Sequence, residues 1–457
     1  MTVDDDLTDT PATAVDQESA RRQWPAPAPS TTWDIARRVV GSPWLILVAW
    51  VLTRAMMMHD WSAKYQYING DPNYYYWALH YVTSIDQRLP EYPVPVVAFL
   101  ELFRWPAADI ASAYVTVFAI GMAALDAGFT VLLWSFRGRV AAWYWMVFGF
   151  FMGPLLWFRF DVLPAVIVGV ALLLVTRRPA TSGVLLGLGA AIKLWPALLL
   201  LPLLHRGRAG RRRTQGLLVT GGLLALVSWA AVGWTRLVSP LTWQGDRGLQ
   251  IESVPASFAM AGKSFGDTLQ WTIAMSKYNA YEITGPGVST ALAVSSVLMA
   301  LVLGLAAVFA VLGWQALRDL SAFDLTLAGA ALIAFLIVAN KTFSPQYMFW
   351  LGAPLAVLVL HAIRPPRGTD AREIRSQRVI AGWLAGAGLI AARLTQVEYP
   401  DHYGDLIFVT PADPVITSAL ILRNLLLVII AIGATIHAMR RFWRAGSSRS
   451  TRSGGPS

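Results

Sequence analysis

The chain has 457 residues, of which 56% are hydrophobic and only 14% are charged, with 20 Trp and no Cys. This composition excludes the soluble globular classes and indicates a polytopic helical membrane protein, and the missing cysteine excludes disulfides, thiolate metal sites and a cysteine nucleophile. The formal net charge of +10 comes from arginines in short links between apolar runs, where charge orients a membrane protein, so it argues against nucleic acid as a partner.

The chain begins with a polar segment of 38 residues, rich in Pro, Ala and Asp, which we expect to be a disordered cytoplasmic tail. We expect no cleavable signal, because the first apolar run begins about 40 residues into the chain. A membrane domain of residues 39–438 and a basic cytoplasmic tail of residues 439–457 follow. The apolar runs, judged against the ~20 residues that a spanning helix needs, lie at about 41–58, 107–135, 140–157, 161–176, 181–204, 216–236, 289–316, 325–341, 346–361, 378–394 and 417–436.

The arginine-rich links predict the sidedness of these runs, because cytoplasmic loops carry an excess of Arg and Lys. If all of them lie inside, residues 181–204 must enter and leave the membrane on the same face. A hairpin that turns at residues 193–196 satisfies this condition, since Pro196 cannot continue a helix. A single straight span would instead invert every later segment. The links assigned to the cytoplasm are those at 137–139, 177–178, 205–213 and 364–378 and the tail with Arg440, Arg441 and Arg444.

With the hairpin, the count becomes about eleven to twelve membrane elements with both termini inside. The fold class we predict is an all-α, polytopic membrane protein with a helical bundle and extracytoplasmic loops. The segments assigned to the extracytoplasmic side are 59–106, 237–288, 342–345 and 395–416, and they carry the unusual chemistry. Segment 237–288 is too polar to cross lipid, yet too aromatic and patterned to be a simple linker.

Asp71 is the first candidate for chemistry, because it lies between Gly70 and the aromatic run Tyr-Tyr-Tyr-Trp at 74–77, just beyond the first apolar run. A carboxylate can abstract a proton, and neighbouring aromatic rings can stack on sugar faces. Both features suit an enzyme that moves a sugar from a lipid carrier. The alternative is an interfacial aromatic belt with a turn-forming Asp-Pro pair.

Charged residues at membrane depth are costly, so each one needs a physical reason. Asp126 is expected to be structural, paired with an interior partner. Arg159 and Asp161 flank Phe160 and are expected to pair with each other and anchor a helix end, or to serve the site. Lys193 and Lys341 belong to a set of only five lysines, all predicted outside or at membrane depth. Two explanations remain for these lysines. Either each ammonium binds a lipid phosphate, or each side chain extends to the membrane interface.

Six short segments together resemble a known family, the GT-C glycosyltransferases of family 87. These are polyprenyl-phosphate-mannose-dependent mannosyltransferases of actinobacteria, and they include the enzyme that elongates phosphatidylinositol mannosides. The resemblance covers about residues 40–436 and keeps the family's order. The segments are Gly-Asp-Pro-Asn-Tyr-Tyr at 70–75, Glu-Tyr-Pro-Val-Pro at 91–95, Arg-Phe-Asp at 159–161, Ile-Lys-Leu-Trp-Pro at 192–196, Arg-Gly-Leu-Gln-Ile-Glu-Ser at 247–253 and Asn-Lys-Thr-Phe-Ser-Pro-Gln-Tyr at 340–347.

The resemblance implies a plasma-membrane enzyme that takes a sugar from a polyprenyl-phosphate donor on the extracytoplasmic face. The sugar that the resemblance favours is mannose. The acceptor would be a glycolipid or an envelope glycan, as in lipoglycan biosynthesis. The family's loop aspartate maps onto Asp71. This chain departs from the family where Asp-Leu-x-Val-Tyr reads Asp-Pro-Asn-Tyr-Tyr at 71–75 and where Tyr-Pro-Pro reads Tyr-Pro-Val-Pro at 92–95, so the acceptor and the sugar stay open.

Inverting transfer from a sugar-1-phosphate lipid needs one base for the acceptor hydroxyl and cationic stabilisation of the leaving phosphate. Asp71 is the predicted base. The predicted contacts to the donor phosphate or sugar are Lys341, Arg247, Lys193, Arg159, Gln250, Glu252, Gln346 and Tyr347. The predicted aromatic or acceptor contacts are Tyr75, Trp61 and His402.

No cofactor is expected besides the polyprenyl-phosphate sugar, which is a co-substrate. His59, Asp60 and His402 form no metal-ligand pattern of recognisable spacing, which leaves metal dependence open. Two rival classes share the membrane architecture. A lipid or glycan transporter would be favoured by pseudo-symmetric broken helices, and a noncatalytic scaffold would tolerate removal of Asp71. Within the enzyme class, a polyprenyl-phosphate arabinofuranosyl or other pentosyl transferase is the nearest alternative.

Overall fold

The computed structural model describes residues 41–317 and 319–447. The chain divides into two units, Met1–Ala49 and Trp50–Ser457, and the helical bundle belongs to the second. The predicted tail of residues 1–38 lies outside the described residues, and so does the end of the predicted tail from residue 448 onwards. Residues 439–447 continue the last helix rather than starting a tail.

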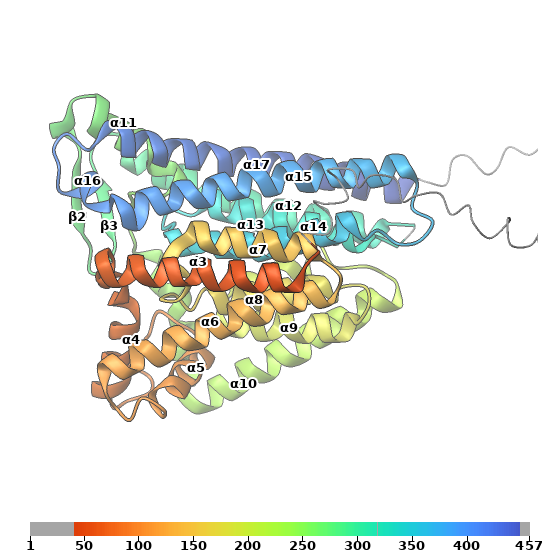
Figure 1. Ribbon diagram of the computed structural model, residues 1–457, viewed down its shortest axis with the longest axis horizontal. Helices are drawn as coiled ribbons and strands as arrows, with labels where there is room; N and C mark the ends of the chain where they lie inside the picture. Colours follow the sequence, from red (N-terminus) through yellow and green to blue (C-terminus); the bar gives the residue numbers. More distant parts are fainter. Residues whose placement is uncertain (1–40, 318, 448–457) are drawn as a thin grey trace, which may run out of the picture. The chain divides into compact units, whose positions relative to one another are not determined.

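Every apolar run predicted from the sequence falls on a helix (Figure 1). Among the described residues, eight helices are long and apolar enough to cross a membrane, and two more are apolar but shorter, at Val162–Leu173 and Pro179–Ile192. The all-α polytopic membrane fold is therefore confirmed. The helices are α3 (Pro43–Lys64), α6 (Ala111–Ser135), α7 (Arg139–Met152), α8 (Val162–Leu173), α9 (Pro179–Ile192), α10 (Arg208–Gly245), α12 (Val288–Gln315), α13 (Ala322–Ala339), α14 (Met348–Ile363), α15 (Ala371–Gln396) and α17 (Pro414–Ser447).

The segments between the long helices hold shorter elements that the sequence did not predict. Three strands form an antiparallel sheet in the order β1-β3-β2, with Leu249 opposite Ile283 and Thr272 opposite Thr284. Leu249 and Ile283 belong to a buried apolar cluster, which explains why this polar segment is structured. The short elements are α4 (Gly70–Tyr81), α5 (Val94–Arg104), α11 (Ser257–Phe265), α16 (Tyr403–Ile407), β1 (Leu249–Gln250), β2 (Thr272–Met275), β3 (Tyr281–Thr284), and the single turns η1 (Gln66–Asn69), η2 (Gly153–Leu156), η3 (Trp195–Leu200), η4 (Val254–Ala256), η5 (Thr268–Gln270), η6 (Pro345–Tyr347) and η7 (Val397–Asp401).

Local sequence signals explain where several helices begin and bend. Ser321 and Asp324 form a capping box at the start of α13, and the Asp370 side chain accepts hydrogen bonds from the first backbone N–H groups of α15. In α10 the helix is interrupted at Gly233, whose φ of 76° lies in the left-handed region that favours glycine. A side chain at this position would be strained, so the kink is encoded by the glycine.

The predicted hairpin within residues 181–204 is present. The helix α9 ends at Ile192, just before Lys193, and η3 returns the chain toward the end from which α9 started. Two contacts establish the reversal, because the guanidinium of Arg213 donates at 3.0 Å to the carbonyl of Val175 and at 2.8 Å to that of Leu203. The chain therefore leaves and re-enters the bundle at one level, and α9 and α10 run parallel.

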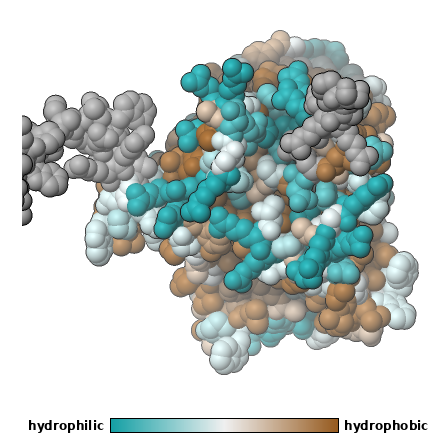
Figure 2. Space-filling view, turned by 90° about the vertical axis from the view of Figure 1, so that its right-hand side faces the viewer, coloured by the Kyte–Doolittle hydropathy of each residue, from teal (hydrophilic) through white to brown (hydrophobic). Residues whose placement is uncertain are grey.

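All the arginine-rich links lie at one end of the bundle, which we call the arginine end. Besides the Arg213 contacts, the Arg364 Nε donates to the carbonyl of Arg137 at 3.2 Å, and the guanidinium of Arg441 binds the carboxylates of Asp324 and Glu373. Figure 2, which looks onto this end, shows hydrophilic side chains gathered across it. The prediction that these links share one side is confirmed, whereas their cytoplasmic location stays a prediction.

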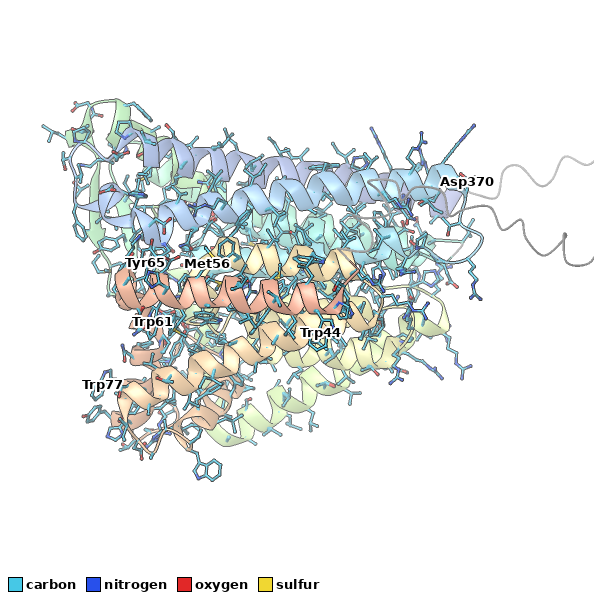
Figure 3. The ribbon with its side chains drawn as sticks, in the orientation of Figure 1. Trp44, Met56, Trp61, Tyr65, Trp77 and Asp370 are labelled. Atoms are coloured by element: carbon cyan, nitrogen blue, oxygen red, sulfur yellow. The ribbon has the colours of Figure 1, made fainter. Side chains whose placement is uncertain are left out.

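The four segments predicted on the other side meet at the opposite end, which we call the site end. Trp61, Tyr65 and Trp77 lie there, far from Asp370 at the arginine end (Figure 3). Hydrogen bonds join the segments to one another, for example from the Tyr67 hydroxyl to the carbonyl of Pro400 at 2.5 Å. The site end therefore contains every loop in which the sequence placed candidate chemistry.

The buried charge of Asp126 has a structural role, as predicted. Its carboxylate accepts hydrogen bonds from Nε and a terminal nitrogen of Arg54, both at 2.9 Å. The indole N–H groups of Trp50 and Trp145 donate to it at 3.0 and 2.9 Å. Four donors thus satisfy a carboxylate that has no exposed surface, and they tie α3, α6 and α7 together.

Candidate active site

Asp71 lies in the first turn of α4, where Gly70 starts the helix. Arg159 Nε approaches Asp71 Oδ2 at 3.1 Å, and the buried hydroxyl of Tyr75, one turn further along α4, donates to the same oxygen at 3.3 Å. No hydrogen bond or ion pair among the described residues involves Oδ1. The side chain of Asp71 is 24% exposed. One carboxylate oxygen is therefore fixed by the protein, and the other is available to a ligand.

Arg159 connects Asp71 to two other segments of the site end. Its terminal nitrogens donate to the carbonyls of Ile68 and Phe158, both at 2.9 Å, and to the hydroxyl of Tyr399 at 3.1 Å. The predicted pairing of Arg159 with Asp161 is therefore wrong. The two residues lie in an irregular turn between η2 and α8, and their side chains find different partners.

Asp161 pairs instead with Lys193, at the tip of the α9–η3 hairpin. Lys193 Nζ lies 2.5 Å from Asp161 Oδ1, and the indole of Trp350 donates to the same oxygen at 2.7 Å. The ammonium also faces the rings of Phe160, Tyr347 and Trp350 at 4.9 to 5.1 Å. The charge of Lys193 is thus neutralised within the protein, which leaves it less free to hold a phosphate than the sequence predicted.

Aromatic rings bridge the Asp71 and Lys193 clusters. The ring of Tyr75 lies 6.0 Å from that of Phe160, and Tyr92 packs edge-on against Phe160 at 5.0 Å. Burial raises the pKa of the Tyr75 and Tyr92 hydroxyls well above the ordinary value, so both stay protonated and can donate hydrogen bonds. The wall between the two charged clusters is therefore aromatic with neutral hydroxyl groups.

Arg236, which the sequence analysis did not single out, holds the loop that presents Tyr92. It is buried in the part of α10 beyond the Gly233 kink. Its guanidinium donates to the carbonyls of Arg88, Leu89 and Tyr92 at 3.0 to 3.1 Å. Three charge-assisted bonds to one loop fix its backbone, so the kinked end of α10 positions the aromatic wall.

Lys341 is bonded to the backbone of residues 245–250, the segment at the site end that contains Arg247. Lys341 Nζ donates to the carbonyl of Gly245 at 2.9 Å, and the Lys341 carbonyl accepts from the backbone N–H of Gln250 at 3.0 Å. The guanidinium of Arg247 lies 5.6 Å from the ring centroid of Tyr278, and its buried Nε has no hydrogen-bond partner among the described residues. Both cations retain donors for a ligand.

Gln250 and Glu252 are buried side by side behind these cations. Gln250 Nε2 donates to Glu252 Oε2 at 2.7 Å and to the Ser344 hydroxyl at 3.0 Å. Burial raises the pKa of the Glu252 carboxyl, and the bond from Gln250 opposes that shift. Both side chains are almost fully enclosed, which makes them supports for the Lys341 segment rather than open ligand contacts.

A buried ion pair that the sequence analysis missed closes this cluster. Arg423 and Glu398 are both fully buried and lie 3.0 Å apart, and Arg423 also donates to the backbone carbonyl of Glu252 at 2.8 Å. Its guanidinium stacks over the ring of Phe343 at 4.5 Å. An arginine inside the apolar run 417–436 was a readable signal, because a charge at membrane depth needs a partner.

The remaining predicted residues occupy the margin of the site end. Trp61 donates its indole N–H to the side chain of Asn69 at 2.8 Å and packs against Phe158. His402 is half exposed and pairs with Asp405 at 3.0 Å. Gln346 is half-buried, and no hydrogen bond joins its side chain to a described residue. None of these contacts tests the predicted ligand roles. Within the described residues, no group of three or more His, Asp or Glu could hold a metal ion.

Comparison with known proteins supplies the family. The model of glycosyltransferase family 87 matches residues 92–339, which is more than half of the chain. No curated protein and no solved structure matches the chain. The matched range includes Arg159, Lys193, Arg247 and Glu252, whereas Asp71 precedes it. The chain therefore belongs to glycosyltransferase family 87, and it is a multi-pass membrane glycosyltransferase.

Proposed function

We propose that this enzyme transfers a sugar from a polyprenyl-phosphate donor to a hydroxyl of a glycolipid or envelope glycan. Mannose is the sugar that we propose. The observation that carries the proposal is the Asp71 carboxylate, with Oδ2 held by Arg159 and Tyr75 and Oδ1 without a partner among the described residues. A general base must be oriented by the protein and still have an atom that reaches the proton to be removed. Asp71 meets both conditions.

In the proposed reaction, Asp71 Oδ1 takes the proton of the acceptor hydroxyl while the acceptor oxygen attacks C1 of the sugar. The bond between C1 and the phosphate oxygen breaks, and its electron pair leaves with polyprenyl phosphate. Attack opposite the leaving group inverts the configuration at C1. Negative charge grows on the phosphate, and fixed cations stabilise it. Lys341 and Arg247 suit this role, because both have donors that the described residues leave unused.

Arg159 and Lys193 fit supporting roles in the proposed reaction. Arg159 donates to Ile68, Phe158 and Tyr399 and forms an ion pair with Asp71, so it orients the base. The charge of Lys193 is neutralised by Asp161, and aromatic rings surround its ammonium. We therefore propose that Lys193 helps to form the sugar-binding surface and does not bind the donor phosphate. The rings of Tyr75 and Tyr347 are buried at 1% and 7% exposure and pack against other aromatic rings, so we assign them to the aromatic wall of the site rather than to direct stacking on the sugar.

We further propose that the site end faces the extracytoplasmic side of the plasma membrane and that both termini are cytoplasmic. The support is the collection of arginine-rich links at the opposite end of the bundle, because positive loops stay in the cytoplasm. A donor carried by a long polyprenyl chain stays in the bilayer while its sugar phosphate reaches the site end.

The decisive experiment is sugar transfer by purified Asp71→Asn enzyme. Asn keeps the size of the side chain but cannot take up the proton, so we expect turnover to fall by about 10² to 10⁴ at saturating donor and acceptor. Asp86→Asn is the matched control, because Asp86 is exposed in the same loop region and lies outside the Asp71 cluster. Near wild-type turnover by folded Asp71→Asn enzyme would refute the base assignment.

The same assay identifies the sugar and the acceptor class. Radiolabelled polyprenyl-phosphate mannose and polyprenyl-phosphate arabinofuranose are offered separately, with extracted envelope lipids and glycans as acceptors. We expect label from the mannose donor in the acceptor fraction and none from the pentose donor. Transfer from the pentose donor alone would replace mannosyl by arabinofuranosyl transfer, with the same role for Asp71.

A further inference from the structure

A groove between α9 and α10 lies outside the site end. The two helices run parallel and approach closely because glycines form their interface: a Cβ built on Gly183 would lie 2.0 Å from the carbonyl oxygen of Arg213, and one on Gly216 would lie 2.5 Å from that of Ala180. Beside this close contact a groove of about 280 Å³ opens at the surface. Its lining side chains include Ala180 and Val184 from α9 and Arg212, Gln215, Val219 and Thr220 from α10.

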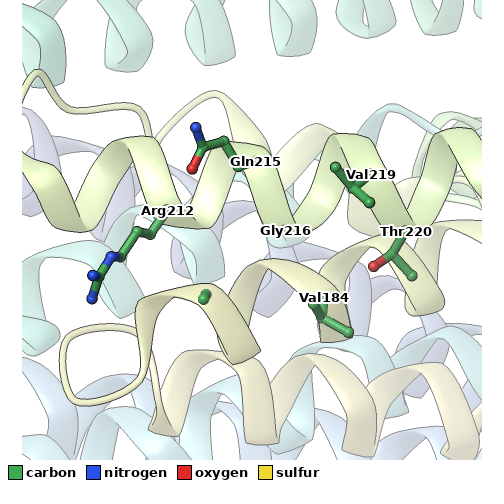
Figure 4. Close-up of a pocket in the computed structure, with 7 residues that line it drawn as sticks. Val184, Arg212, Gln215, Gly216, Val219 and Thr220 are labelled. Carbon is green, nitrogen blue, oxygen red and sulfur yellow. The ribbon is translucent and has the colours of Figure 1, made fainter.

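The groove is polar at one end and apolar at the other. Figure 4 shows Arg212 and Gln215 at one end of the row and Val184, Val219 and Thr220 at the other. Arg212 neighbours Arg213, whose bonds to Val175 and Leu203 fix this level of the bundle at the arginine end. The apolar part therefore extends from the arginine end into the membrane, along the helix axis.

The surface around the groove faces lipid. Val184 and Val219 are 42% and 69% exposed, and Leu223, one turn beyond Val219, is 57% exposed. α10 is the least buried of the spanning helices among the described residues. Apolar side chains at this exposure on a spanning helix contact acyl chains, so a chain lying in the groove would continue the lipid surface inward.

The positive charge at the polar end has no acidic partner in the neighbouring sequence. The chain contains no Asp or Glu between Asp161 and Asp246, a stretch that includes all of α9 and all of α10. Arg212 is exposed, and no hydrogen bond or ion pair joins its guanidinium to a described residue. Arg208 lies one helical turn before Arg212 and on the same face of α10. An acidic residue from another part of the chain, Asp319, lies at this level, 3.8 Å from Nδ1 of His205, but no ion pair joins it to Arg212 or Arg208 among the described residues. An anionic ligand would supply the counter-charge that these two arginines lack.

We propose that this groove binds one anionic glycerophospholipid from the leaflet at the arginine end. Its phosphate binds Arg212 and Arg208, Gln215 contacts the glycerol esters, and one acyl chain lies along Val184 and Val219. Basic pockets between spanning helices are suited to anionic headgroups, because the guanidinium forms paired bonds to phosphate in a low dielectric. The bound lipid braces α9, whose last residue precedes Lys193 of the α9–η3 hairpin.

The test uses the full-length enzyme in detergent, with phosphatidylglycerol and phosphatidylcholine of identical acyl chains as probes. Native mass spectrometry counts retained lipid, and thermal unfolding reports stabilisation. We expect one retained phosphatidylglycerol and a saturable rise in Tm that phosphatidylcholine does not give. Arg212→Ala should raise the phosphatidylglycerol concentration at half effect about five-fold, from the usual contribution of one arginine near an anionic surface. Equal stabilisation by both lipids would overturn the headgroup assignment.

Two further variants distinguish lipid binding in the groove from general attraction of anionic lipid to surface arginines. Arg375→Ala removes an exposed arginine in α15, outside the groove lining, and should leave the titration unchanged. Thr220→Trp fills the groove without changing charge and should abolish lipid retention, with Val184→Phe as a second filling variant should that protein fail to fold. An equal effect of Arg375→Ala, or retained lipid in a folded filling variant, would overturn the proposed site.

Discussion

The cluster around Asp126 allows a quantitative test of how a buried ion pair holds α3, α6 and α7 together. Arg54→Met removes the counter-charge and two of the four donors on Asp126, whose carboxylate has no exposed surface. Breaking a buried pair from one side costs about 3 to 5 kcal/mol. Asp126→Leu leaves the buried Arg54 without its counter-charge, at a similar cost, and also leaves the indole N–H groups of Trp50 and Trp145 without their acceptor, at about 1 to 3 kcal/mol each.

The double variant separates the ion pair from the rest of the cluster. Replacing both charges leaves only the indole N–H groups of Trp50 and Trp145 without their acceptor, at about 1 to 3 kcal/mol each. We therefore expect about 2 to 6 kcal/mol for Arg54→Met with Asp126→Leu, against about 8 to 16 for the sum of the single changes. The difference is the coupling free energy of the pair.

Equilibrium unfolding by sodium dodecyl sulfate in mixed micelles, followed by tryptophan fluorescence, measures the four proteins of this cycle. Arg88→Met is the matched control, because the Arg88–Glu101 pair has a short distance of 2.8 Å but is partly exposed, at 21% and 32%. Exposed pairs contribute about 0.2 to 1 kcal/mol. Additive single changes, or a control as costly as Arg54→Met, would refute the reasoning.

Three further predictions concern the site and the topology. Lys341→Ala should raise the donor KM about ten- to a hundredfold, the usual range for a lost charge-assisted contact, with little change in Tm; an unchanged KM would show that Lys341 only holds the carbonyl of Gly245. Burial raises the pKa of Glu252 above its ordinary 4.5, so the folded state holds this proton more tightly than the unfolded state does. Stability should therefore fall as pH rises from that value through the folded pKa. The Tm of Glu252→Gln should lose this dependence on pH, and an unaltered dependence would assign it to other groups. A reporter fused after Arg213 should read cytoplasmic and one fused after Gly248 extracytoplasmic, and the opposite pair of signals would reverse the proposed sidedness.

The fold could be predicted because apolar length and arginine placement are local properties of the sequence. Each of the eleven apolar runs became a helix, and the hairpin that turns at Pro196 followed from the requirement that the arginine-rich links share one side. The β1–β3 sheet was missed because its strands have two to four residues each, too short for an alternating pattern to be recognised.

The site was predictable in its residue types but not in its pairings. Asp71, Arg159, Asp161 and Lys193 were all identified, yet the expected pair between Arg159 and Asp161 is replaced by two pairs with distant partners. Closeness in sequence suggested the wrong pair, because side chains two residues apart in an irregular turn can point in different directions. Glu398 was missed because its partner belongs to another helix.

The reversal within the α9–η3 hairpin has a consequence for how the chain is threaded through the bilayer. Residues 179–204 return to the level at which they began. The hairpin therefore enters and leaves the bilayer on the same side, and it does not change the side on which any later loop lies. Shortening this segment would remove Lys193 from its pairing with Asp161 while every later loop kept its compartment. Loss of one full span, such as α12, would instead exchange the compartments of all the loops that follow it.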